Sequence, residues 1–77
     1  MTEDQRLLAA ERVRGEIAEI ERQAMSDVPG WPQYLTQLSD TGRESAMSAA
    51  LSDRPLTFKR WRVLRLAART LGSQSLR

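Results

Sequence analysis

The chain has 77 residues, of which 40% are hydrophobic, and its 12 Lys and Arg against 10 Asp and Glu give a formal net charge of +2. It contains no cysteine and no histidine, which excludes disulfides, thiolate nucleophiles and the usual zinc ligands. A chain this short forms one domain and buries only about 60% of its unfolded surface. We therefore expect its stability to depend on helix packing, oligomerisation or a partner.

Several classes of protein are disfavoured by what the chain lacks. The first residues show no charged stretch followed by an apolar run, and no segment approaches the ~20 apolar residues that cross a bilayer. We therefore expect no secretory signal, no transmembrane segment and a cytoplasmic location. Glycine-rich phosphate loops, nucleophile turns and metal-binding loops are also missing. We expect neither enzyme activity nor a bound metal or cofactor.

The sequence predicts a single all-α domain, residues 1–77, because β-branched and aromatic residues nowhere alternate as they do in strands. A long N-terminal helix is followed by a helical core at residues 31–72 and a frayed tail at 73–77. Four helices are expected, at about residues 2–25, 32–38, 43–52 and 57–71.

The first predicted helix begins with Thr2 as its cap, followed by two acidic residues that suit the positive end of a helix. Its apolar residues recur at alternating spacings of three and four, which places them on one stripe. This stripe consists of Ala10, Val13, Ile17, Ile20 and Ala24. Two interpretations follow: the stripe packs on its own domain, or it forms the interface of a homodimer.

The middle of the chain contains two short predicted helices. Prolines and a glycine around Trp31 end the first helix, and we expect this tryptophan to pack into the core at the corner. Thr41 and Glu44 have the spacing of a capping box, which predicts the start of the third helix at about residue 43. The apolar side of that helix is Ala46, Met47, Ala50 and Leu51, and its polar side is Glu44, Ser45, Ser48 and Ser52.

The fourth predicted helix begins after Thr57 as its cap and ends at Gly72. Three arginines lie within about 60° of its circumference, and apolar residues cover most of the remainder. A helix that is apolar nearly all round is usually buried by several neighbours. We therefore expect this helix at the centre of the fold, with the three arginines facing solvent. We call them the arginine ridge: Arg62, Arg65 and Arg69.

The charges are segregated along the chain. All ten carboxylates lie in residues 1–53 with five arginines, whereas the last 24 residues hold six arginines, one lysine and no acid. A basic segment of this kind needs an anionic partner, either outside the protein or on its own acidic half. The ridge arginines follow one another at about 5 Å and can neutralise nucleic-acid phosphates. Alternatively, they are solvated, pair with Glu16, Glu19 and Glu21, or meet an acidic protein or membrane surface.

Two segments carry a resemblance to a known family. Residues 50–57 (ALSDRPLT) and 64–72 (LRLAARTLG) resemble the end of Cro/repressor-type helix-turn-helix domains. The resemblance implies that residues 32–38 form the supporting helix and that residues 43–51 enter the major groove. Together with the basic segment, it gives a predicted nucleic-acid-binding set of Arg43, Ser45, Ser48, Arg54, Lys59, Arg62, Arg65 and Arg69.

Three functions are consistent with this sequence. The first is a small DNA-binding regulator of transcription that uses the helix-turn-helix-like segment and the basic C-terminal helix. The second is a small helical adaptor or inhibitor, of the size used by phages and mobile elements, that binds a host protein through its ridge or apolar stripe. The third is a structural, self-assembling subunit. The expected partners are DNA or an acidic protein surface, together with a second copy of the chain in a homodimer.

Overall fold

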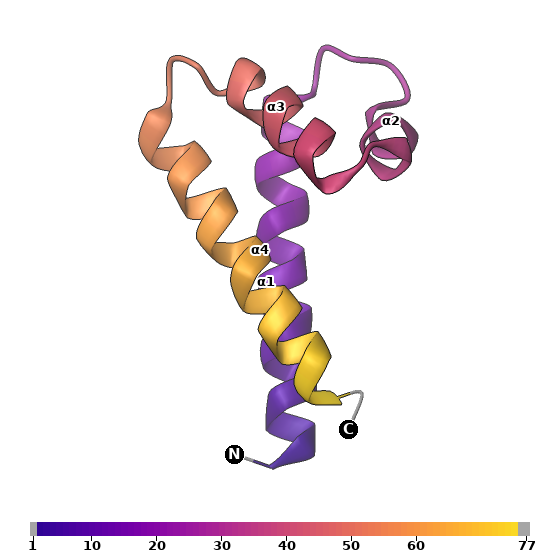
Figure 1. Cartoon of the computed structure of the whole chain (residues 1–77), viewed down its shortest axis with the longest axis vertical. Coiled ribbons are helices and arrows are strands. Elements are labelled where there is room, and N and C mark those ends of the chain that lie inside the picture. The colour runs from indigo at the N-terminus through magenta and orange to yellow at the C-terminus, as the bar shows by residue number, and fades with distance from the viewer. Residues whose placement is uncertain (1, 76–77) are drawn as a thin grey trace.

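The computed structural model describes residues 2–75, with side chains for residues 2–71, and it consists of four helices. They are α1 (Glu3–Ala24), α2 (Trp31–Gln37), α3 (Asp40–Ala50) and α4 (Pro55–Ser75). The all-α prediction is therefore confirmed, and the described residues form no strand. In Figure 1, the long helices α1 and α4 lie against each other, while α2 and α3 gather at one end of this pair.

Local chemistry explains where α1 and α2 begin. Thr2 caps α1 as predicted, because its hydroxyl accepts a hydrogen bond from the Gln5 backbone N–H at 3.2 Å and the Gln5 side chain accepts from the Thr2 N–H at 3.0 Å. Gly30 precedes α2 at φ 72°, a left-handed conformation that glycine adopts most easily. Trp31 then begins α2, and its half-buried side chain packs against the core, as predicted.

The predicted start of the third helix was wrong. Ser39 caps α3 instead of Thr41, because its hydroxyl accepts a hydrogen bond from the Gly42 N–H at 3.1 Å. Thr41 consequently lies inside the helix, and the Glu44 side chain is bound to Arg62 of α4 rather than completing a capping box. Tertiary pairing therefore replaces the local capping contact that the spacing predicted.

Both predicted ends of the fourth helix also need correction. α4 begins at Pro55, two residues before Thr57, and proline suits a first helical position because its missing N–H would have no partner there. The helix passes through Gly72 to Ser75. A glycine lowers the stability of a helix by about 1 kcal/mol relative to alanine, but it ends the helix only where the backbone turns away from the helix axis. The tail predicted as frayed is thus helical at residues 73–75, and residues 76–77 lie outside the described part.

The core lies at the end of the molecule where α2 and α3 meet the long helices. Its buried residues come from every part of the fold: Met25, Leu35, Met47, Leu51 and Trp61. The predicted apolar side of α3 is confirmed, because Ala46 and Ala50 also pack against this cluster. Phe58 stacks on Trp61 with ring centroids 5.7 Å apart, which joins the first turns of α4 to the core.

The apolar stripe of α1 packs inside the monomer. Ala10 is buried, Ile17, Ile20 and Ala24 pack against the core, and Val13 is half-buried. Since α4 runs along α1, it covers the stripe that a homodimer would need. The interpretation in which the stripe packs on its own domain therefore describes this structure, and the dimer interface expected at these residues is already occupied.

The fourth helix is not surrounded on all sides. Trp61 is its only buried residue among those described, whereas Val63 and Leu66 are exposed. The helix expected at the centre of the fold, open only at its ridge, has a further open side, because α1 and α3 cover two sides of α4 and leave a third uncovered. The open side of α4 is apolar, while its arginine ridge is turned toward α3.

Candidate functional site

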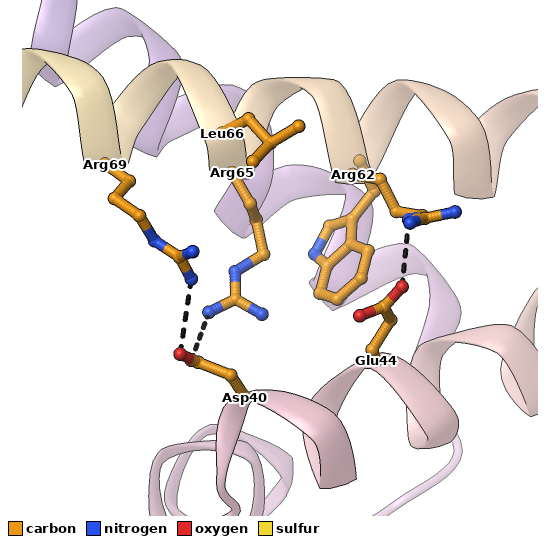
Figure 2. A pocket seen from close by; sticks show the side chains of 7 residues that line it. Asp40, Glu44, Arg62, Arg65, Leu66 and Arg69 are labelled. Atoms are coloured by element: carbon orange, nitrogen blue, oxygen red, sulfur yellow. Dashed lines mark hydrogen bonds and ion pairs between the residues drawn. The ribbon is translucent and has the colours of Figure 1, made fainter.

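The arginine ridge of α4 is paired with carboxylates of α3 (Figure 2). Arg62 Nε lies 2.9 Å from Glu44 Oε1. Arg65 Nη2 donates to Asp40 Oδ1 at 2.9 Å, and Arg69 Nη2 donates to Asp40 Oδ2 at 3.2 Å. Arg62 and Arg69 are exposed, as expected of the ridge, whereas Arg65 is largely enclosed, and the acidic half of the same chain supplies ion-pair partners for all three.

The spacing of the two sequences makes this pairing possible. Asp40 and Glu44 stand four residues apart on one side of α3, and the arginines stand three and four residues apart on one side of α4. The hydrogen bond from Arg65 lowers the pKa of Asp40, and the positive charges of Arg65, Arg69 and Arg43 lower it further. Three guanidinium groups therefore face two carboxylates, which leaves this cluster with one net positive charge.

Arg65 is the most enclosed member of the ridge. Its side chain is only 20% exposed, and its guanidinium lies over the Trp61 ring at 5.1 Å from the centroid. Arg62 lies over Phe58 at 5.9 Å in a more open setting. Arg65 therefore holds α4 to α3 through its Nη2 hydrogen bond, and to the core through its position over the Trp61 ring.

The α1 glutamates considered as partners of the ridge have other contacts. Glu16 pairs with Arg60 at 3.2 Å, and Glu21 accepts a hydrogen bond from Trp61 Nε1 at 3.1 Å. Glu19 accepts from Arg22 Nε at 3.0 Å and from Gln23 at 3.1 Å. These hydrogen bonds, that of Arg22 first, lower the pKa of Glu19 to about 2.

The other predicted nucleic-acid contacts differ in how they relate to the ridge, because the groove lined by Ser45 and Ser48 also includes Glu44 and Phe58, which Arg62 contacts. Arg43 is half-buried, and its Nε donates to the Leu35 carbonyl oxygen at 3.0 Å, so it holds the end of α2. Ser45 and Ser48 are exposed on α3, where they line a shallow groove with Phe58. Two exposed cations complete the set: Arg54, whose Nε is 3.9 Å from Asp53, and Lys59.

A surface that the sequence did not predict lies along the open side of α4. Leu56 is 81% exposed, Val63 60% and Leu66 61%. At 100° per residue they share one side of the helix with Lys59 and Thr70. We call these five residues the outer face of α4. The sequence did contain a signal for this outer face, because the apolar residues of α4 span an arc too wide for two neighbouring helices to cover.

Within residues 2–75, no helix has the length and apolarity needed to span a bilayer, and His, Cys, Asp and Glu form no group suited to a metal ion. Comparison of the chain with protein-family models, curated proteins and solved structures gave no match. The arguments for a function therefore come from the surfaces described above.

Proposed function

We propose that the protein is a small helical adaptor that binds an acidic and partly apolar surface of another protein through the outer face of α4. The observation that carries this proposal is the exposure of Leu56, Val63 and Leu66 along one side of one helix. Exposed apolar side chains that lie together within a few turns, with polar residues at the edges, are typical of interaction sites.

The charge of α4 favours an acidic partner. Its described side chains include five cations and no carboxylate. Four of these cations are ion-paired inside the chain: Arg60, Arg62, Arg65 and Arg69. Lys59 has no ion pair among the described residues and lies within the outer face, so a carboxylate of the partner can complete it.

Duplex DNA binding is a second candidate, favoured by the exposed serine side of α3. Ser45 and Ser48 leave room for close approach, and Arg54 and Lys59 are exposed nearby in the sequence. Each ridge arginine and Arg43 already has one partner within the chain, which a phosphate would have to share or replace. The helix-turn-helix resemblance stays a prediction.

Photo-crosslinking in cells distinguishes the two candidates, because it captures whichever macromolecule contacts a chosen position. We would place p-benzoylphenylalanine at Leu66 in one variant and at Ser48 in another, which are both exposed positions. We expect protein adducts at position 66 that decrease when Lys59→Glu is added, and no adducts at position 48. Nucleic-acid adducts at position 48, or no protein adducts at position 66, would contradict the proposal.

A salt titration with labelled generic duplex provides the independent control. The adaptor proposal predicts no steep loss of duplex affinity with rising salt, because the ridge arginines then remain paired with Asp40 and Glu44. If the wild type binds duplex with such a salt dependence and Ser45→Ala with Ser48→Ala weakens it, the DNA candidate replaces the adaptor.

A further inference from the structure

The basic helix α4 would attract nucleic acid if its cations were unpaired. Its described side chains include four arginines and one lysine, and none of them is acidic. Arginines on successive turns of one helix side can neutralise nucleic-acid phosphates, and this attraction acts on any base sequence. Nucleic acid would therefore compete with an acidic protein surface for the same helix. Selective binding of a protein requires that the ridge be made less attractive to phosphates.

Two carboxylates of α3 stand opposite the ridge. The ridge arginines extend from α4 toward α3, where Asp40 contacts two of them and Glu44 contacts the third (Figure 2). One oxygen of Asp40 lies 2.9 Å from Arg65 Nη2, and its other oxygen lies 3.2 Å from Arg69 Nη2. A single carboxylate thus bridges two guanidinium groups, as a phosphate group also can.

The five charged side chains of the ridge and its partners line one cleft between α3 and α4. The volume of this cleft is about 110 Å³, and Trp61 and Leu66 complete its walls. A phosphate that enters the cleft approaches both carboxylates as well as the arginines, so repulsion by the acids opposes attraction by the ridge. The three arginines and two carboxylates carry one net positive charge, whereas the arginines alone would carry three.

The core holds α3 beside the ridge. Met47 and Leu51 of α3 are fully buried, so the two carboxylates stay within reach of the arginines even when an ion pair opens. The hydrogen bond from Arg65 also lowers the pKa of Asp40, which keeps this carboxyl group ionised. A phosphate from outside must therefore compete with anions that are tethered at the site, which gives the carboxylates a high effective concentration.

The ridge borders the outer face of α4. Leu66 belongs to the outer face and also lines the cleft, and Arg62 lies about 40° from Leu66 around the helix. A nucleic acid held by the ridge would cover part of the surface that we propose for the protein partner. Pairing within the chain leaves Lys59, which lies on the outer face, as the cation of α4 with no ion pair among the described residues.

We infer that Asp40 and Glu44 are specificity-determining residues that exclude nucleic acid from the arginine ridge. Their carboxylates pair with the arginines and repel phosphates, which keeps the adjoining outer face available to a protein. The benefit to the outer face rests on the proposed function, whereas the exclusion of nucleic acid depends only on the ridge and α3.

A salt titration with labelled generic duplex compares three proteins. The first is the wild type, the second carries Asp40→Asn with Glu44→Gln, and the third carries Glu11→Gln with Asp27→Asn. Glu11 and Asp27 are exposed and have no ion pair among the described residues, so the third protein matches the second in net charge but retains the ridge pairing.

We expect the second protein to bind duplex at low salt at least about tenfold more tightly than the other two. Its affinity should also fall more steeply with salt. The slope of log affinity against log salt concentration should be larger by about 2–3, because up to three arginines then reach phosphates.

Variants of the ridge show whether this gain comes from the arginines. Adding Arg62→Gln and Arg69→Gln to the second protein should remove the gain, and both residues are exposed, so their loss spares the position of Arg65 over Trp61. Glu44→Gln alone releases only Arg62 and should increase the slope by about 1, which tests the inference even if the double variant does not fold. Circular dichroism verifies that each variant remains helical.

Equal duplex affinities of the second and third proteins would overturn the inference, because net charge alone would then explain them. The inference is also wrong if the wild type binds duplex as tightly as the second protein, or if the gain survives the loss of Arg62 and Arg69. Crosslinking at Leu66 in the wild type tests the adaptor separately. If it yields no protein adducts while the second protein gains duplex affinity, the adaptor is refuted and the exclusion of nucleic acid by α3 stands.

Discussion

The two ends of the α1–α4 pair differ in how they are stabilised. Where α2 and α3 join, five side chains are buried in a continuous cluster around Trp61. Toward the other end α1 and α4 face each other alone, Ala10 is the only buried side chain among the described residues there, and Leu7 and Leu8 are exposed. The core end therefore maintains the fold, while apolar side chains are exposed at both ends, Leu56 in the first turn of α4 and Leu7 and Leu8 at the open end.

A matched pair of leucine truncations tests the difference between the buried core and the exposed side of α4. Leu51→Ala removes a side chain that is fully buried in the core, and we expect it to lower the free energy of unfolding by about 2–5 kcal/mol. Leu66→Ala truncates an exposed leucine of α4 and should change the free energy of unfolding by less than about 0.5 kcal/mol. Urea unfolding followed by circular dichroism measures both, and similar losses would mean that the outer face is buried in solution.

Two glycines provide a second contrast. Gly30 has φ 72°, so Gly30→Ala places a side chain in the left-handed region and should destabilise the fold by about 1 kcal/mol. Gly15 lies within α1 with open space around it, and Gly15→Ala should stabilise by up to about 1 kcal/mol. Thermal unfolding at low protein concentration tests the opposite signs, and a destabilising Gly15→Ala would show that the position is crowded in solution.

The arginines of the ridge provide a third contrast, because they lie at different distances from the core. Arg65→Gln removes the stacking on Trp61 and should cost about 1 kcal/mol of unfolding free energy. Arg69 is more exposed and lies nearer the open end, so Arg69→Gln should cost less than about 0.5 kcal/mol. Equal costs for the two variants would indicate that stacking on the tryptophan adds nothing to the fold.

The pH dependence of stability tests the pairing of Asp40. The pKa of Asp40 is lowered in the folded state, first by the hydrogen bond from Arg65. The ionised carboxylate therefore stabilises the fold fully above the unfolded pKa of about 3.9, and this stabilisation is lost as pH falls through the lower folded pKa. Asp40→Asn should therefore flatten the acid side of the stability profile. Arg65→Gln removes the same hydrogen bond and should change the profile in the same direction, whereas an unchanged slope in both would contradict the pairing.

The smallest expected effect concerns Glu19, which is paired with Arg22 on the surface of α1. Carboxyl-carbon NMR should give this group a pKa of about 2 in the wild type. In Arg22→Gln the pKa should rise toward the ordinary value of about 4.3, because the first of the hydrogen bonds that lower it is gone. A titration that Arg22→Gln leaves unchanged would show that the surface pair does not persist in solution.

Much of the secondary structure could be predicted because its causes are local. The hydroxyl of Thr2 caps α1 within a few residues, and the spacing of Met47 and Leu51 along α3 indicates its buried side. The predicted starts of α3 and α4 failed where two local signals competed. Ser39 was the better cap than Thr41, and Pro55 began a helix that Thr57 was expected to cap.

The candidate site was harder to predict, because it depends on which helices become neighbours. The sequence located the arginine ridge correctly on one side of α4, but it could not show that Asp40 and Glu44 lie beside it, 25 and 18 residues away from Arg65 and Arg62. Charge alone leaves this choice open, since carboxylates of α1 and α3 were equally available.

By itself, the sequence determined four helices, the buried side of α3 and the separation of acidic from basic segments, because helix periodicity, capping and charge are properties of neighbouring residues. The contacts between helices established that two carboxylates of α3 pair with the ridge, that α4 covers the stripe of α1, and that Leu56, Val63 and Leu66 remain exposed. The physical reason is that burial depends on how many helices surround a side chain. In a chain of 77 residues, the available helices cover only part of each apolar surface.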